Sequence, residues 1–297
     1  DVGQGHINLT VESTGAQQGG VQDVGAVGGG HHDHAQVGLE TVHLDQHLVQ
    51  GLFAFVVASA QAGTTLTAKG RNGALSVIAF YDRGTMFNPG PVLYMNKVAV
   101  GPRGRGAVDI NASVTENLRA LASRLGKTVQ ELGVVVLDRP RHDDLIGEIR
   151  DCGARVISIT DGDVAGAIST AWPNSGADIL FGIGGTPEGV IAAAALKGLG
   201  GEIQGVLHAS TPEERERAEA LGYDFSRVLT TDDLVQGDNC YFSATAITDG
   251  DFLRGVRFTE FGATTQSMVV RSRSGTVRTV ETFHRHNKLQ EFSTAGF

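Results

Sequence analysis

The chain has 297 residues, of which 41% are hydrophobic and 19% are charged, as in a soluble globular protein large enough to bury a substantial core. The formal net charge of -9 argues against nucleic acids and anionic membranes as partners. No apolar run approaches the roughly 18 residues of a membrane-spanning helix, so we expect no transmembrane segment. Two cysteines without disulfide or zinc spacing fit a reducing cytoplasm.

The composition changes near residue 62. Residues 1–62 hold no Lys, Arg or Pro, and they carry six of the ten His. We interpret this segment as disordered, or as an artefact such as a frame error or a chimera upstream of Gly63. A metal-binding tract at His31–His34 (HHDH) is a further alternative, without a recognisable fixed fourth ligand.

From Gly63 onward the pattern predicts an α/β fold. Strands are expected at 74–80 and 92–100, followed by a helix over 111–126 that begins with a capping box of Ser113 and Glu116. Three strand–loop–helix units follow, with strands at 133–137, 155–160 and 177–181, which indicates parallel βαβ units in the second half. Further strands are expected at 239–247, 268–273 and 276–283, the last two joined by a hairpin at Ser274–Gly275.

Each of the three units has a polar loop between its strand and its helix. In a parallel sheet these loops gather at the carboxyl ends of the strands, where ligands bind. The first loop contains Arg139 and Arg141, whose guanidinium groups suit a phosphate ester. The alternative is a solvated basic turn that pairs with Asp143 and Asp144.

The second loop, Asp161-Gly162-Asp163, opens a helix. Its carboxylates can bind sugar hydroxyls or a hard cation, or simply cap the helix. A sharper alternative is a dehalogenase-type phosphatase with Asp161 as nucleophile and Asp163 as general acid. In that family Thr or Val usually stands where this chain has Ala165.

The third loop, residues 182–189 (GIGGTPEG), is rich in glycine. Glycines let the backbone approach a ligand, Pro187 suits the first turn of a helix, and the helix start favours an anion. Glu188 in that turn can bind a cation, whereas the spacing does not fit a dinucleotide fingerprint. A glycine turn used only for packing is the alternative, and Tyr94 taken alone is an ordinary strand tyrosine.

Four segments carry a family resemblance. YMNKVAVGP (94–102), LDRPRH (137–142), ITDGDVAGAI (159–168) and GIGGTPEGV (182–190) resemble, in this order, the signature segments of class II fructose-1,6-bisphosphatases. The resemblance covers residues 63–297 and disfavours the dehalogenase alternative. It implies a layered sugar-phosphatase fold similar to that of inositol monophosphatases. It also implies Mn²⁺- or Mg²⁺-dependent hydrolysis of fructose 1,6-bisphosphate to fructose 6-phosphate and phosphate in gluconeogenesis.

The resemblance also implies roles for single residues. Thr64, which would orient the attacking water, and Glu188, a metal ligand, match catalytic positions. The residues that match substrate-binding positions are Gly63, Thr64, Tyr94, Arg139, Pro140, Arg141, Asp161, Gly162, Asp163 and Gly185.

By the same resemblance, residues 63–132 form the remainder of a first sugar-phosphatase domain, which 240–297 would complete, and 133–239 form an α/β substrate-binding domain. Of the family's metal ligands only Glu188 is matched, since Ser59 to Ala62 supply no carboxylate. We therefore expect impaired hydrolysis, or alternatively an inactive sugar-phosphate-binding homologue without the metal centre. We further expect a cytoplasmic homo-oligomer that binds a sugar bisphosphate and neither nucleic acid nor membrane.

Overall fold

The computed structural model describes residues 10–12, 41–43, 55–59, 66–285 and 287. Most of segment 1–62, with its expected disorder and the His31–His34 tract, lies outside the described residues. Gly63 and Thr64 lie outside them as well. The strands are β1 (Thr10–Glu12), β2 (Thr41–His43), β3 (Phe55–Ser59), β4 (Leu75–Tyr81), β5 (Tyr94–Val100), β6 (Gly133–Leu137), β7 (Arg155–Ile159), β8 (Ile179–Gly185), β9 (Glu202–His208), β10 (Leu229–Thr230), β11 (Tyr241–Ala246), β12 (Arg257–Thr259), β13 (Gly262–Arg271) and β14 (Thr276–Arg285).

The helices alternate with the strands in the middle of the chain. They are η2 (Pro102–Gly104), α2 (Val114–Leu125), η3 (Val129–Glu131), η4 (Pro140–His142), α3 (Asp143–Asp151), α4 (Asp163–Ala171), α5 (Thr186–Leu199), α6 (Pro212–Ala220) and α7 (Thr231–Leu234). No helix of the described residues is long and apolar enough to cross a membrane.

The first sheet is mixed, with the order β10-β9-β5-β8-β6-β7. Strands β8, β6 and β7 run parallel, as expected for βαβ units, because α3 and α4 connect them. Strand β5 is inserted antiparallel between β8 and β9, which the βαβ pattern did not predict.

The second sheet is antiparallel, with the order β12-β13-β11-β4-β3 and with β14 paired to β13. It joins β3 and β4 to the last strands of the chain, and the predicted hairpin is confirmed because Arg271 pairs with Thr276 across the turn. A separate pair, β1 and β2, is also antiparallel. The division into domains 63–132 and 133–239 stays a prediction.

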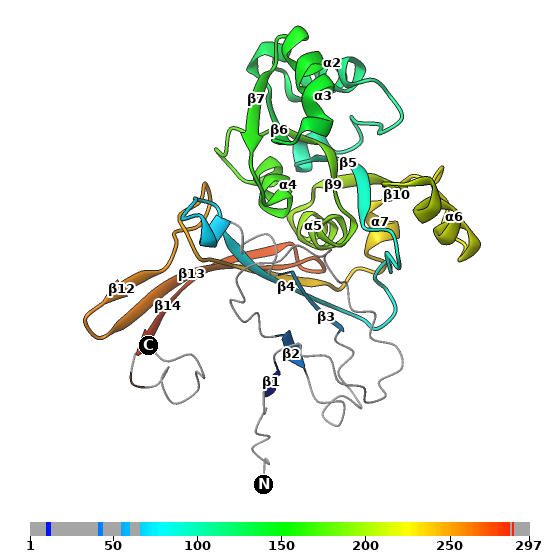
Figure 1. The fold of residues 1–297 in the computed structure, drawn as a ribbon. Coiled ribbons are helices and arrows are strands. Elements are labelled where there is room, and N and C mark those ends of the chain that lie inside the picture. Colours follow the sequence, from blue (N-terminus) through cyan, green and yellow to red (C-terminus); the bar gives the residue numbers. More distant parts are fainter. Residues whose placement is uncertain (1–9, 13–40, 44–54, 60–65, 286, 288–297) are drawn as a thin grey trace.

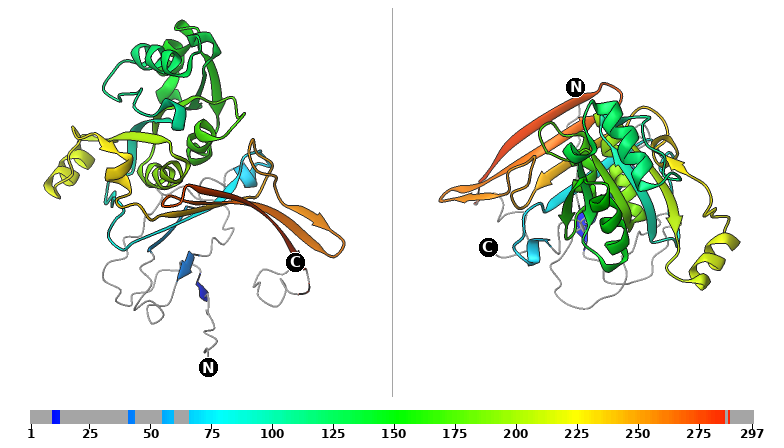
Figure 2. Two further views of the ribbon diagram at one scale, coloured as in Figure 1. Left: turned by 180° about the vertical axis from the view of Figure 1, so that it is seen from behind. Right: turned by 90° about the horizontal axis from the view of Figure 1, so that it is seen from above.

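Helices α4 and α5 lie between the two sheets, as Figures 1 and 2 show. One apolar cluster fills this space and joins α5 residues such as Ile191 to Met95 of β5 and Phe242 of β11. A second cluster lies on the other face of the first sheet, where α2 and α3 contribute Leu121 and Ile149. The molecule is therefore a mixed α/β structure with two sheets, and the helix pair packed between them anchors the loops at the carboxyl ends of the parallel strands.

Candidate active site

The three polar loops meet at one edge of the first sheet, as the parallel arrangement of β6, β7 and β8 requires. The amino end of β5 also reaches this edge, because β5 runs antiparallel to β8 and Tyr94 pairs with Gly185. Strand β6 lies between β7 and β8. Its loop, which carries both arginines, is therefore flanked by the other two.

The two arginines connect these loops. Arg139 Nη1 donates to the carbonyl of Thr160 at 2.7 Å, at the end of β7. Arg141 donates through Nε and Nη2 to the carbonyl of Ile183 at 3.2 and 2.7 Å, in β8. Its guanidinium also lies over the ring of Tyr94, with Cζ 5.6 Å from the ring centroid.

Neither Arg139 nor Arg141 forms an ion pair within the described residues, so the expected alternative of a turn paired with Asp143 and Asp144 is wrong. The carboxylates of Asp143 and Asp144 instead stand in the first turn of α3, where the helix dipole stabilises them. A carbonyl oxygen carries no formal charge, so these contacts do not compensate the positive charge of the guanidinium groups. Each group also has N–H donors that remain available. The loop is thus a positive site suited to an anion.

His142 holds the arginine loop against β6 and β8. The sequence analysis did not single out this residue. The residue is 2% exposed, Nε2 accepts from the Ile183 N–H at 2.8 Å, and Nδ1 lies 2.8 Å from the Leu137 carbonyl oxygen. Since Nε2 accepts, the proton is on Nδ1, and the ring is neutral. Burial, reinforced by the nearby Arg141 and Arg139, lowers the pKa of His142 and keeps this form.

Asp161 and Asp163 differ in their surroundings. Asp161 is half-buried, and its Oδ1 accepts from the Gly162 N–H at 2.9 Å. Gly162 precedes α4 with a φ of 84°, a left-handed conformation that favours glycine. Asp163 is the first residue of α4 and is 7% exposed. Neither carboxylate acts as a side-chain N-cap, so capping does not explain this motif.

Lys97 is the main site residue that the sequence reasoning missed. Its ammonium Nζ lies 2.5 Å from Asp163 Oδ2 and donates to the Gly185 carbonyl at 3.0 Å. A signal was available, because strand alternation puts Lys97 on the same face as Met95 and Ala99. A lysine between two core residues needs a buried partner.

The glycines of the third loop allow close approach. Gly184 and Gly185 belong to the end of β8, although the sequence predicted a loop there. A Cβ on Gly185 would lie 1.7 Å from Oε2 of Glu188, so the carboxylate folds back over this glycine. Pro187 occupies the first turn of α5, as predicted.

The acidic groups of the site influence one another. Burial raises the pKa of Glu188, and the nearby Asp163 carboxylate raises it further, while Lys97 acts in the opposite direction. Burial and the neighbouring carboxylates therefore disfavour the ionised form of Glu188, and a bound cation would offset this repulsion. The same turn holds the Thr186 hydroxyl, which is fully buried without a hydrogen-bond partner among the described residues.

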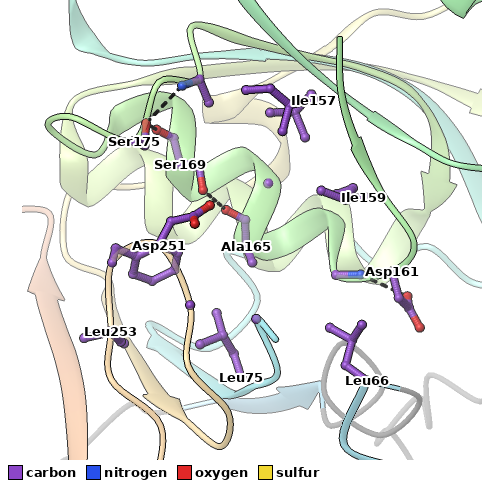
Figure 3. A pocket seen from close by; sticks show the side chains of 17 residues that line it. Leu66, Leu75, Ile157, Ile159, Asp161, Ala165, Ser169, Ser175, Asp251 and Leu253 are labelled. Carbon is purple, nitrogen blue, oxygen red and sulfur yellow. Dashed lines mark hydrogen bonds between the residues drawn. The ribbon is translucent and has the colours of Figure 1, made fainter. Parts of the chain in front are cut away.

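A hollow of about 100 Å³ includes Asp161 and Gly162 in its lining. Figure 3 shows some of the side chains that surround it. Asp161 lies at one end, and the walls are largely apolar side chains, including Leu75, Ile157 and Leu253. Neither arginine lines it. The positive charge of the arginine loop thus lies outside the lining of this hollow.

The structure thus brings Tyr94, both arginines and the acidic residues to one edge of the first sheet. Comparison with known proteins gives the family of the chain. The family model described as "Bacterial fructose-1,6-bisphosphatase, glpX-encoded" matches residues 40–284. The chain belongs to the class II fructose-1,6-bisphosphatase family. The match begins at residue 40, so part of segment 1–62 fits the family, contrary to the expectation of a resemblance confined to 63–297, and it ends at residue 284.

Curated relatives support the class II fructose-1,6-bisphosphatase assignment. "D-fructose 1,6-bisphosphatase class 2/sedoheptulose 1,7-bisphosphatase" of Crocosphaera subtropica is 47% identical over 235 residues, which cover 75% of this chain and 68% of that protein. "Fructose-1,6-bisphosphatase 1 class 2" of Escherichia coli is 41% identical over 235 residues, covering 75% of this chain and 70% of that protein. The chain is accordingly a hydrolase of carbohydrate metabolism by family.

Membership in the class II fructose-1,6-bisphosphatase family implies a divalent metal. Glu188 fits one position of such a site, because a cation would offset the repulsion among the buried carboxylates. The described residues hold no group of three His, Cys, Asp or Glu that could bind a metal ion. They do not fit a complete metal centre by themselves, and Gly63 and Thr64 lie outside them.

Proposed function

We propose that this chain hydrolyses fructose 1,6-bisphosphate to fructose 6-phosphate and phosphate, with Mn²⁺ or Mg²⁺. The observation that carries the proposal is the arginine loop, which forms no ion pair within the described part of the chain and lies beside buried carboxylates in a chain of this family. The layered sugar-phosphatase fold, similar to that of inositol monophosphatases, is part of the same proposal. The mixed α/β structure with helices between two sheets supports it.

The phosphate would bind at Arg139 and Arg141. Two guanidinium groups provide charge-assisted hydrogen bonds to a dianionic ester, and Tyr94 beneath Arg141 restricts where the guanidinium can move. Pro140 between them starts η4 and fixes the turn, so both side chains leave the loop in set directions. These groups bind and orient; they transfer no proton.

The sugar would bind at the acidic side of the site. Asp161 and Asp163 can each accept a hydrogen bond from a sugar hydroxyl. Gly162 supplies the left-handed turn between them, and Gly185 leaves room for the Glu188 carboxylate. Glu188 would hold the metal, which when bound polarises the phosphoryl group and activates water. By the family pattern, Thr64 would orient the attacking water.

Phosphate release from fructose 1,6-bisphosphate tests the proposal. We expect release with Mn²⁺ or Mg²⁺ and none with EDTA. The rate should be lower than that of the Escherichia coli relative assayed alongside, since Ser59 to Ala62 supply none of the carboxylates expected there. Glu188→Gln should abolish release, whereas Glu216→Gln, an exposed residue of α6, should not change it.

Two other outcomes are informative. Metal-independent binding of fructose 1,6-bisphosphate without any release would favour the inactive sugar-phosphate-binding homologue. If the protein neither binds fructose 1,6-bisphosphate nor releases phosphate from it, both functions are contradicted. The homo-oligomeric state and the cytoplasmic location stay predictions, which size-exclusion chromatography and fractionation would test.

A further inference from the structure

Lys97 is a buried cation on the apolar face of β5. It is 3% exposed, and the alternate residues Met95 and Ala99 on the same face belong to the core between the sheets. An ammonium group in such surroundings is costly unless it is paired. Sheet geometry alone gives no reason for a lysine here, and a hydrophobic residue would pack with its neighbours.

The ammonium makes two contacts that belong to different loops. It lies 2.5 Å from Oδ2 of Asp163, at the start of α4, and 3.0 Å from the carbonyl oxygen of Gly185, at the end of β8. Among the described residues, Oδ1 of Asp163 has no hydrogen-bond partner. Lys97 therefore occupies one carboxylate oxygen and leaves the other for a ligand.

Glycine makes this contact possible. A Cβ on Gly184 would lie 2.2 Å from Asp163 Oδ2 and 3.0 Å from Lys97 Nζ. A residue with a side chain at position 184 would therefore clash with the ion pair between Lys97 and Asp163. Because Glu188 folds back over Gly185, fixing the Gly185 carbonyl also fixes the residue on which the Glu188 carboxylate rests.

We infer that Lys97 is a positioning residue, which sets the orientation of the Asp163 carboxylate toward the sugar and holds the β8–α5 turn beneath Glu188. This inference rests on the proposed function. It assigns the lysine neither proton transfer nor substrate contact. Its effect passes through Asp163 and Gly185, whose geometry would relax if the ammonium were removed.

Steady-state kinetics of Lys97→Met test the inference. We expect KM for fructose 1,6-bisphosphate to rise by roughly 10-fold or more, because a misoriented Asp163 loses a charged hydrogen bond to the sugar. The metal concentration for half-maximal activity should rise as well. A lysine that served stability alone would lower the active fraction, so kcat would fall with KM unchanged, and that result would overturn the inference.

Lys127→Met is the matched control. Lys127 makes an ion pair of similar length, 2.6 Å, with Asp178, which precedes β8 at the opposite end from the site. We expect KM near that of the parent protein in this variant. Lys97→Arg keeps the charge but must displace Gly184, so we expect it to retain the fold and still raise KM.

A readout independent of turnover covers the case in which Lys97→Met folds poorly or the parent protein is inactive. Amide hydrogen exchange of residues 182–189 in Lys97→Arg should be faster than in Lys127→Met, while exchange in α2 stays equal. Fructose 6-phosphate binding, measured by calorimetry with EDTA present, should weaken in Lys97→Arg alone. An inactive parent protein would contradict the proposed function, whereas unchanged exchange and binding would contradict the role of Lys97.

Discussion

Arg141 is where the phosphate proposal can be tested most directly at the scale of one residue. Its guanidinium is held by the Ile183 carbonyl and the Tyr94 ring, without an ion pair within the described residues. Removing it with Arg141→Met should raise KM by roughly 10-fold or more, because a charged hydrogen bond to phosphate is lost. The effect on kcat should be smaller, as binding in both ground and transition states is weakened.

Arg215→Met provides a control for Arg141→Met. Arg215 also lies over an aromatic ring, with Cζ 5.0 Å from the centroid of Phe225, but it pairs with Glu219 on exposed α6. Its loss should leave KM unchanged. An Arg141→Met enzyme with the parent KM would mean that phosphate binds elsewhere.

His142 gives the stability of the protein a pH dependence. Burial lowers its pKa in the folded state, whereas an unfolded chain has the ordinary value of about 6.5. Below that value the unfolded state takes up a proton that the folded state does not. The stability contributed by the neutral ring is therefore complete above about pH 6.5 and is lost as the pH falls toward the folded pKa.

Urea unfolding of the parent protein and of His142→Gln between pH 7.5 and 5 measures this contribution. We expect the difference in free energy of unfolding to be largest near neutrality and to shrink on acidification. The comparison cancels other titrating groups, including Glu188, whose raised pKa acts in the opposite direction. A difference that does not depend on pH would show that His142 is not held neutral by burial.

At the scale of elements, the junction of β8 and α5 depends on the absence of a side chain at Gly185. In Gly185→Ala the new Cβ would displace the Glu188 carboxylate, which lies 1.7 Å from its ideal position. We expect a large loss of metal-dependent phosphate release with a smaller loss of thermal stability.

Gly147→Ala, in the interior of α3 with nothing within 4 Å of its Cβ, should raise stability by about 1 kcal/mol and leave release unchanged. Equal effects of both variants on release would contradict a role for Gly185 in the site.

Several elements could be predicted from local patterns. The three parallel strands and the capping box of Ser113 and Glu116 were read correctly, because apolar periodicity and capping chemistry act over a few residues. The meeting of the three polar loops followed from the same pattern, since loops at the ends of parallel strands must share an edge.

What could not be predicted is long-range pairing. Whether β5 joins the parallel strands, and in which direction, depends on residues about 90 positions later, such as Gly185 opposite Tyr94. Strand β9 and helix α6 were not anticipated. Without the antiparallel register of β5, Lys97 cannot be assigned to Asp163, which explains why the sequence reasoning missed this ion pair.

For the whole molecule, α5 joins both sheets into one core. Its residues share an apolar cluster with β5 and β9 of the first sheet and with β4, β11 and β13 of the second. Lys197 near its end ties it to α7 through Asp232 at 2.6 Å. Because the two sheets share the cluster around α5, they should unfold in a single cooperative transition.

Phe242→Ala tests this cooperativity. Phe242 is 1% exposed in β11 of the second sheet, and its truncation leaves a cavity that should cost about 3–5 kcal/mol.

Trp172 is the only tryptophan, and it lies at the end of α4 with its ring centroid 5.6 Å from that of Phe252. Its fluorescence reports on the helix layer, and circular dichroism reports on all elements. We expect both probes to shift together to lower denaturant concentration in Phe242→Ala, and Phe258→Ala, which removes a 72% exposed side chain, to shift neither. Separation of the two probes in Phe242→Ala would mean that the second sheet unfolds on its own, so that the active-site edge of the first sheet does not depend on it.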